Sequence, residues 1–376
     1  MTVSAKSVAA LAGAGLLAVL AGCGGNGESA TDDAIAVTAT DSACEVATTS
    51  AKAGKITFEV TNNGSQVTEF YLYGPGDRIM GEVENIAPGL TRRLIVDVRD
   101  GGDYQTACKP GMKGEGIRGD FTVTGTAAQR DDPDGGLGRA VAGYHDYVTG
   151  EIALLVPRTE EFVAAVKAGD VSRAKELFPV ARTHWERVEP VAESFGDLDP
   201  RIDGREDVVE EGLEFTGYHR LEKDLWQSGL RPDSPEVADR LLADIRELAR
   251  RAPNVELTPV QLANGAKELL DEVATGKITG EEDRYSHTDL WDFRANVDGS
   301  KAAVEALRPV VREREPALLD TLDTKFAELD TLLDRHRAGD GYVLYTDLSE
   351  QQVRELSAAV DALGEPASKV AEVVSR

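Results

Sequence analysis

The stretch VTGTAAQRDDPDGG, residues 123–136, marks the point at which the hydrophobic pattern of this chain changes. Before it, apolar residues alternate with polar ones, which is the period of a half-buried β-strand. After it, apolar residues recur at spacings of three and four, which is the period of an amphipathic helix. The 376-residue chain is therefore predicted to contain two domains of different class, joined by a linker at residues 127–136.

Residues 34–126 are predicted to form a β-sandwich. The segments KITFEVT (55–61) and RRLIVDV (92–98) each place an apolar residue at every second position. Turn-forming residues separate such segments, as in NNGS (62–65) and DGGD (100–103). Several short strands divided by turns of this kind are typical of two packed sheets.

Residues 137–376 are predicted to form an all-α helical bundle. Asp170 stands where a helix cap is expected, and Ser234-Pro235 and Thr258-Pro259 each combine a capping residue with proline at a helix start. Later runs, such as KAAVEALRPVVRE (301–313), keep the apolar spacing of three and four. The chain is thus a multidomain β plus α protein, and it contains no nucleotide-binding glycine motif.

The balance of charge restricts the class of ligand. The chain has 67 acidic and 41 basic residues, which gives a formal net charge of −26. Nucleic-acid binding is disfavoured, because neutralising phosphates requires clustered Lys and Arg. Cations are the more natural ligands of such a protein.

The N-terminus is predicted to be an export signal. Lys6 is followed by an apolar run of small residues and leucines that ends in LAGC, residues 20–23. This ending resembles a bacterial lipobox, so residues 1–22 are predicted to be a lipoprotein signal peptide and Cys23 the lipidated residue. Residues 23–33 would then be a flexible tether. We therefore expect a protein anchored at the cell membrane on its extracytoplasmic (periplasmic) side, in an oxidising compartment.

One candidate site lies in the segment GYHRLEKDLW, residues 217–226. His219 and Glu222 are three positions apart, so they share a helix face and can reach one ion together. Phe215 and Trp226 lie on the same side, which predicts that this face is buried and that the carboxylate needs a partner. An ordinary solvated helix face remains the alternative.

Two acidic segments could complete that site. In HWERVEPVAESFGDLDPRID (184–203), Glu186, Glu189 and Glu193 are predicted to share one helix face, with Asp199 and Asp203 closing over an ion. In GEEDRYSHTDLWDF (280–293), residues 281–283 are all acidic and could form a third wall. Solvation of the first segment and helix capping in the second are the alternatives.

These three segments resemble a known family. GYHRLEKDLW resembles the G-x-H-x-x-E signature of imelysin-like domains, and the two acidic segments resemble the other marked segments of the EfeO-type iron-uptake proteins. That resemblance covers the whole chain and implies a cupredoxin-like sandwich followed by an imelysin-like helical domain. It also implies an extracytoplasmic iron-binding lipoprotein that works with a membrane iron permease and a haem-containing peroxidase.

The resemblance implies a ligand set as well. By position it comprises His219, Glu222, Glu186, Glu189, Asp203 and Glu282. Carboxylate oxygens with one imidazole form a hard site that suits iron, with zinc as an alternative occupant.

The sandwich domain carries a second candidate site. Once Cys23 is assigned to the lipid, Cys44 and Cys108 remain as a pair. The segment GDYQTACKPGM (102–112), with Cys108 and Met112, resembles the copper loop of cupredoxins, and Glu69 takes the place of their first histidine. No histidine precedes His145, so a blue-copper set cannot be completed. Copper held by Cys44, Glu69, Cys108 and Met112, or a Cys44–Cys108 disulfide, remain as alternatives.

The sequence leaves two other functions as alternatives. Imelysin-like domains have been classed with metallopeptidases, but a zinc peptidase helix shows HExxH, and here Arg220 and Lys223 stand at the corresponding positions. A peptidase is therefore disfavoured, while enzymatic assistance of iron oxidation stays open. A surface binding module for a partner or a polysaccharide, bridged by a metal, is the third alternative.

Overall fold

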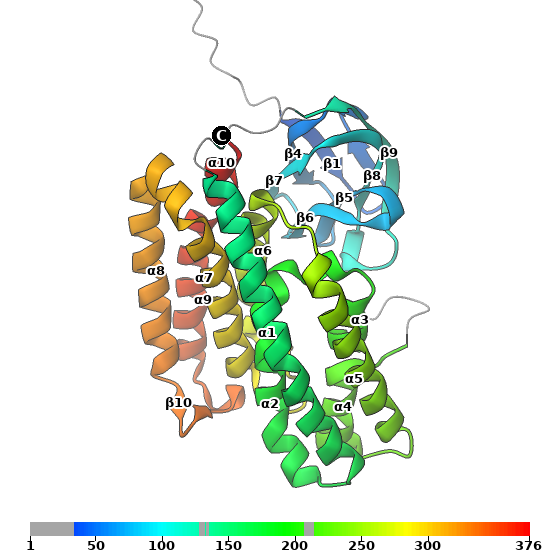
Figure 1. Ribbon diagram of the computed structural model, residues 1–376, viewed down its shortest axis with the longest axis vertical. Helices are drawn as coiled ribbons and strands as arrows, with labels where there is room; N and C mark the ends of the chain where they lie inside the picture. Colours follow the sequence, from blue (N-terminus) through cyan, green and yellow to red (C-terminus); the bar gives the residue numbers. More distant parts are fainter. Residues whose placement is uncertain (1–33, 128–131, 133–134, 207–213) are drawn as a thin grey trace, which may run out of the picture. The chain divides into compact units, whose positions relative to one another are not determined.

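The computed structural model describes residues 34–127, 132, 135–206 and 214–376. Ala34–Arg376 is one compact unit. The predicted signal peptide 1–22, the tether 23–33 with Cys23, and most of the predicted linker 127–136 lie outside the described residues. Within them, a β-sheet domain is followed by a helical domain, as the sequence pattern predicts (Figure 1).

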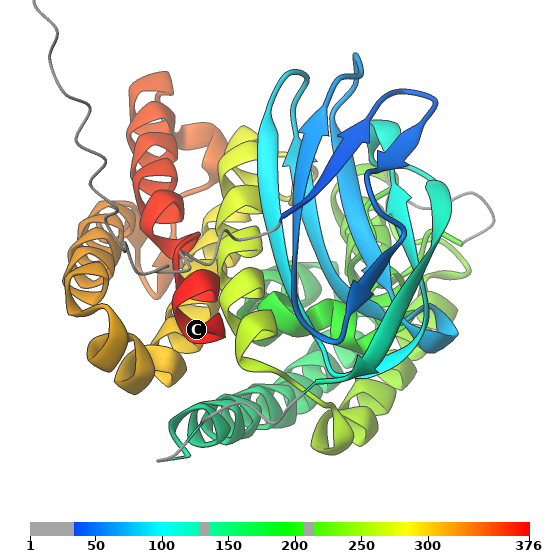
Figure 2. The same cartoon turned by 90° about the horizontal axis from the view of Figure 1, so that it is seen from above.

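Two sheets form the β-sheet domain. One has the strand order β2-β1-β4-β7 and the other the order β3-β9-β8-β5-β6 (Figure 2). The strands are β1 (Ile35–Ala39), β2 (Cys44–Val46), β3 (Ser50–Lys52), β4 (Gly54–Asn62), β5 (Thr68–Tyr73), β6 (Ile79–Ile86), β7 (Thr91–Val98), β8 (Asp100–Cys108) and β9 (Ile117–Thr126). Strand β6 thus stands at the edge of the five-stranded sheet.

Alternation along the strands builds the sandwich core. Ile56 pairs with Val96 and Phe58 pairs with Leu94 between antiparallel β4 and β7, and all four side chains are buried. Phe58 also contacts Phe70 of the other sheet, with ring centroids 5.1 Å apart. A side-chain period of two therefore places one face of each sheet in a shared core.

The helical domain begins at Gly136. Its longer helices are α1 (Gly136–Lys167), α2 (Val171–Val188), α5 (Ser234–Arg251), α6 (Pro259–Thr275), α7 (Asp289–Arg314), α8 (Pro316–Asp334) and α9 (Glu350–Ala367). Shorter ones are α3 (Leu198–Asp203), α4 (Gly217–Lys223) and α10 (Val370–Ser375). A small hairpin, β10 (Arg337–Ala338) and β11 (Gly341–Tyr342), follows α8. Within the described residues, no helix combines the length and apolar character needed to span a membrane.

Two of the three predicted helix caps form. Ser234 is instead the first residue of α5, whose N-cap is Asp233, and its hydroxyl donates a hydrogen bond to Asp224. The side chain of Asp170 accepts a hydrogen bond from the backbone N–H of Arg173 at the start of α2. Thr258 and Gln261 form a reciprocal capping box at the start of α6, with Pro259 in the first turn. Each bond satisfies a backbone N–H group that the helix itself leaves without a partner.

The two domains meet at helix α6. This helix packs against β6 and β7, and the side-chain amide of Asn264 donates a hydrogen bond of 2.8 Å to the carbonyl of Ile95. Ile95 itself belongs to the hydrophobic core of the helical domain. One face of the sandwich is therefore covered by helices, which positions strand β6 beside the acidic segments described below.

Candidate metal centre

Gly217 allows helix α4 to begin in close contact with the end of α3. Gly217 has a φ of +78°, and a Cβ atom there would lie 2.2 Å from the carbonyl oxygen of Ile202. Only glycine tolerates both the positive φ and this close approach. The first turn of α4 is thereby pressed against the end of α3, which brings His219 of α4 beside Asp203 of α3.

His219 lies at the centre of a buried acidic cluster. Its Nδ1 atom is 3.1 Å from Oε2 of Glu222 and 4.0 Å from Oδ1 of Asp283. Its Nε2 atom is 3.4 Å from Oε1 of Glu282 and 3.6 Å from Oδ1 of Asp203. All five side chains are at least nine-tenths buried. Each ring nitrogen therefore faces its own pair of carboxylates.

Glu222 is fixed by the segment that precedes α7. Its Oε1 atom accepts hydrogen bonds from the backbone N–H groups of Tyr285 (2.9 Å) and Ser286 (2.7 Å). Its other oxygen faces Nδ1 of His219. Glu222 thus holds the imidazole ring in one orientation and leaves Nε2 directed toward Asp203 and Glu282.

A buried arginine also enters this cluster. Arg182 of α2 is fully buried and its guanidinium forms ion pairs with five carboxylates, those of Glu186, Asp203, Glu282, Asp283 and Asp292. Its Nη1 atom lies 3.1 Å from Nε2 of His219. Arg182 therefore supplies positive charge to the same carboxylates that surround the histidine.

Lys277 neutralises the neighbouring part of the acidic segment. Its buried ammonium group is 3.1 Å from Oε2 of Glu186 and 2.8 Å from Oε2 of Glu189. The side-chain amide of Asn296 donates to both of these glutamates. Glu186 and Glu189 are therefore held by protein donors and stand beside the histidine cluster, outside the two groups of potential ligands around His219.

Carboxyl groups outnumber basic groups in this region. Among the described residues, three basic side chains (Arg182, Arg205 and Lys277) and His219 face seven carboxylates, which are Glu186, Glu189, Asp203, Glu222, Glu282, Asp283 and Asp292. Burial raises the pKa of Asp283 to about 8, and one oxygen each of Asp283 and Asp292 has no hydrogen-bond partner. Such a cluster is suited to receive a further cation.

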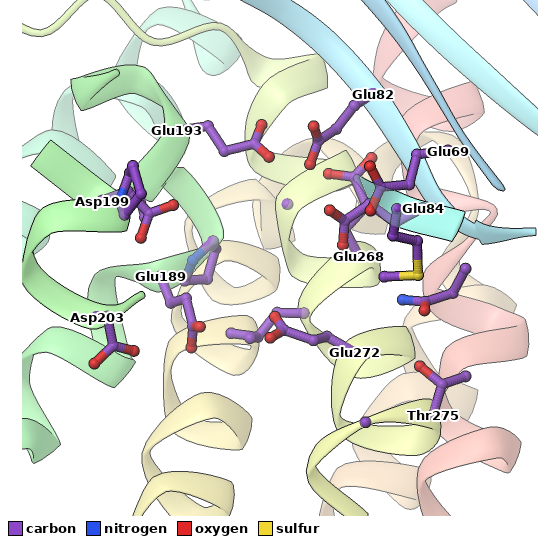
Figure 3. A pocket seen from close by; sticks show the side chains of 18 of the residues that line it. Glu69, Glu82, Glu84, Glu189, Glu193, Asp199, Asp203, Glu268, Glu272 and Thr275 are labelled. Carbon is purple, nitrogen blue, oxygen red and sulfur yellow. The ribbon is translucent and has the colours of Figure 1, made fainter. Parts of the chain in front are cut away.

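The cluster opens onto an acidic cavity of about 310 Å³ (Figure 3). Asp203 and Glu282 line it from the histidine side, together with Glu189, Asp199 and Glu272. Burial is the first cause that raises the pKa of Asp199 to about 7, and the nearby charge of Asp203 adds to it. From the sandwich, strand β6 and Glu69 of β5 contribute further carboxylates to the same cavity.

The predicted helix face with three glutamates does not form, and this expectation was wrong. Helix α2 ends at Val188, and residues 189–195 continue as a tighter 3₁₀ turn. A Cβ atom at Gly265 would lie 1.8 Å from the carbonyl oxygen of Pro190, so this turn packs directly on α6. Glu193 instead points toward Glu82 of the sandwich (Figure 3).

The four predicted sandwich residues are divided between a disulfide and the cavity. Cys44 and Cys108 form a disulfide bond, so in this state neither sulfur is a thiolate. The carboxylate of Glu69 accepts a hydrogen bond of 2.9 Å from the hydroxyl of Tyr71. Glu69 and Met112 both line the acidic cavity.

Of the residues predicted from the sequence, His219, Glu222, Asp203 and Glu282 lie together in the structure, whereas the basic residues among them were not predicted. Arg182 precedes Glu186 by four positions, a spacing that is also common on solvated helices. Lys277 lies in a short 3₁₀ turn after α6. Nothing in their local sequence indicates that both become buried.

Comparisons with known proteins agree with this architecture. Residues 140–370 match the family model described as imelysin, and residues 13–123 match that of the cupredoxin-like domain. The chain therefore combines a cupredoxin-like domain with an imelysin-type helical domain.

Curated relatives narrow this class to one family. The iron uptake system component EfeO of Escherichia coli strain K12 is 38% identical over 346 residues, which cover 90% of this chain and 91% of that protein. Proteins of the same name from Escherichia coli O157:H7 and Shigella flexneri give the same identity and coverage. The chain belongs to the EfeO family.

Proposed function

We propose that this protein is the extracytoplasmic iron-binding component of an iron uptake system, and that it binds iron as cargo at His219. The observation that carries this proposal is that both ring nitrogens of one buried histidine lie within 4.0 Å of carboxylates drawn from three separate segments. Membership of the EfeO family supports the choice of iron. Carboxylate oxygens and one imidazole also match the preference of this metal.

The ligand set follows from the orientation of the ring. The nitrogen Nδ1 is directed to Glu222, which is itself fixed by two backbone donors. Nε2, Asp203 and Glu282 form one group whose potential ligand atoms lie within 4.8 Å of one another, and both carboxylates line the cavity. We therefore assign these three as ligands and Glu222 as the residue that orients His219.

Proton release accompanies binding in this proposal. Burial and Arg182 lower the pKa of His219, but Asp203 and the other surrounding carboxylates outweigh them and raise it to about 10. A metal ion that binds to the ring must therefore displace a proton from it. Displacement of Arg182 from Asp203 would free both oxygens of that carboxylate for the ion.

Delivery of the ion requires a membrane-bound recipient. We propose that the protein is anchored through a lipid on Cys23 and passes iron to a membrane permease, with a haem-containing peroxidase as a further partner. The acidic cavity favours transfer of a cation over that of an anion, because its wall repels negative charge. Relatives in the EfeO family are named as components of an iron uptake system, which supports the presence of further components.

The proposal is tested by measuring iron bound to the purified protein after dialysis against ferric citrate. The double variant His219→Ala, Glu222→Gln should lose one equivalent of iron. A matched control is His184→Ala, Glu151→Gln, which removes another histidine–glutamate pair, 2.6 Å apart, that does not line the cavity. Equal iron content in both variants would contradict the site assignment.

The geometry gives less support to a peptidase. A zinc peptidase site generally uses two imidazoles from one helix and an adjacent glutamate as base. The groups of potential metal ligands found in the described residues contain one histidine, His219, and Glu222 is occupied by two backbone N–H groups. Arg220, which stands where the catalytic glutamate of HExxH would be, forms an ion pair with Asp224.

A further inference from the structure

Strand β6 presents two glutamates to the helical domain. Along β6, Val83 is buried in the sandwich core, so Glu82 and Glu84 project from the opposite face. Glu193, from the 3₁₀ turn of residues 189–195, approaches them from the helical domain. The three side chains offer oxygen atoms that lie within 4.8 Å of one another.

This cluster differs from the one around His219 in its lack of basic partners. Among the residues that the structure describes, no Lys, Arg or His forms an ion pair with Glu82, Glu84 or Glu193. Burial raises the pKa of Glu82 well above its usual range, and the facing charge of Glu193 adds to this effect. Three carboxylates placed this close would repel one another unless protons or a cation neutralise them.

A second observation points to a ligand. Glu82 is only 3% exposed, and its Oε2 atom has no hydrogen-bond partner. Figure 3 shows the carboxylates of Glu82 and Glu193 directed toward each other across the cavity. A buried carboxylate oxygen without a partner is destabilising, so its retention at this position points to a ligand that supplies the missing contact.

We propose that Glu82, Glu84 and Glu193 form a second cation site, which binds iron through oxygen atoms alone. The choice of iron rests on the proposed function. A set of three carboxylates without nitrogen or sulfur suits a hard, multivalent ion. Glu82 and Glu193 line the same cavity as Asp203 and Glu282, at the junction of the two domains. The second site therefore binds the ion transiently as it moves through the cavity to or from His219.

The test compares iron stoichiometry across a set of variants of the whole protein, dialysed against ferric citrate with calcium chloride present. The wild-type protein should bind two equivalents, and Glu82→Gln, Glu193→Gln should bind one. The His219→Ala, Glu222→Gln variant should keep one equivalent, and the combination of all four changes should keep none. Glu59→Gln, Glu176→Gln removes two exposed carboxylates and serves as the control for lost charge.

The outcomes separate the two sites. If Glu82→Gln, Glu193→Gln retains the wild-type iron content, the cluster holds protons only and the second site is overturned, whatever His219 does. If iron is lost from that variant but not from the His219 variant, the second site stands and the proposed function at His219 fails. If the wild-type protein binds two equivalents of iron without calcium chloride but only one equivalent with it, the second site takes calcium and its assignment to iron is overturned. Thermal unfolding checks folding, and the glutamine variants should be at least as stable as the wild type because repulsion is removed.

Discussion

Nη1 of Arg182 lies 3.1 Å from Nε2 of His219, inside a cluster in which carboxylates outnumber basic groups. In the metal-free protein, Arg182 neutralises Asp203 and Glu282, which a bound metal ion would otherwise do. The carboxylates are therefore held in place before iron arrives, and binding requires the guanidinium group to move away from Asp203.

Replacing Arg182 should make the stability of the folded protein depend on bound iron. In Arg182→Met, buried carboxylates lose their partner, which typically costs about 3–5 kcal/mol. We expect a lower melting temperature in chelator and a larger rise on adding ferric citrate than in the wild type. Differential scanning calorimetry measures both. Arg354→Met, at an arginine with 69% of its side chain exposed, is the control and should change little. Wild-type stability of Arg182→Met in chelator would contradict this role.

Glu222 should act on iron affinity through the histidine. In Glu222→Gln, the amide oxygen can still accept from the N–H groups of Tyr285 and Ser286, but its NH₂ group then faces Nδ1 of His219 and cannot accept a proton from it. Loss of such an orienting partner typically lowers metal affinity about 10- to 100-fold. Competition with citrate measures this change. An unaltered affinity would show that the ring orientation does not depend on Glu222.

The disulfide should stabilise the sandwich domain. Cys44 and Cys108 are separated by 64 residues and join β2 of one sheet to the end of β8 in the other. Cys44→Ser, Cys108→Ser should lower the free energy of unfolding by about 2–4 kcal/mol. Urea unfolding followed by tyrosine fluorescence measures the loss. A reducing agent should shift the midpoint of the wild type but leave that of the variant unchanged, and an equal shift in both would refute the assignment.

The pair of Glu151 and His184 should stabilise the protein in a pH-dependent way. Burial alone would raise the pKa of Glu151, but the hydrogen bond to His184 and the charge of Arg187 lower it below the usual value of 4.5. Its contribution is therefore present above the unfolded pKa and is lost as the pH falls through the folded pKa. The difference in melting temperature between wild type and Glu151→Gln should narrow from pH 7 to pH 3. A difference in melting temperature that widens toward pH 3 would contradict a lowered pKa of Glu151.

Local pattern was sufficient to predict the two fold classes and the pairing of His219 with Glu222 on one helix face. The period of two in KITFEVT and the spacing of His219 and Glu222 each arise from the geometry of one element. Arg182 and Lys277 could not be predicted in the same way, because their burial depends on carboxylates up to 110 residues away in the chain. The switch from α2 to a 3₁₀ turn was not predicted either, because the close approach of Pro190 to Gly265 of α6 is a contact between distant parts of the chain.

The most direct measurement is anomalous X-ray diffraction at the iron edge from crystals of the purified protein soaked in ferric citrate. The account predicts a peak within bonding distance of Nε2 of His219 and of carboxylate oxygens of Asp203 and Glu282, with Glu222 outside the coordination shell and still bonded to Nδ1. Iron-loaded crystals with no peak beside His219 would contradict it.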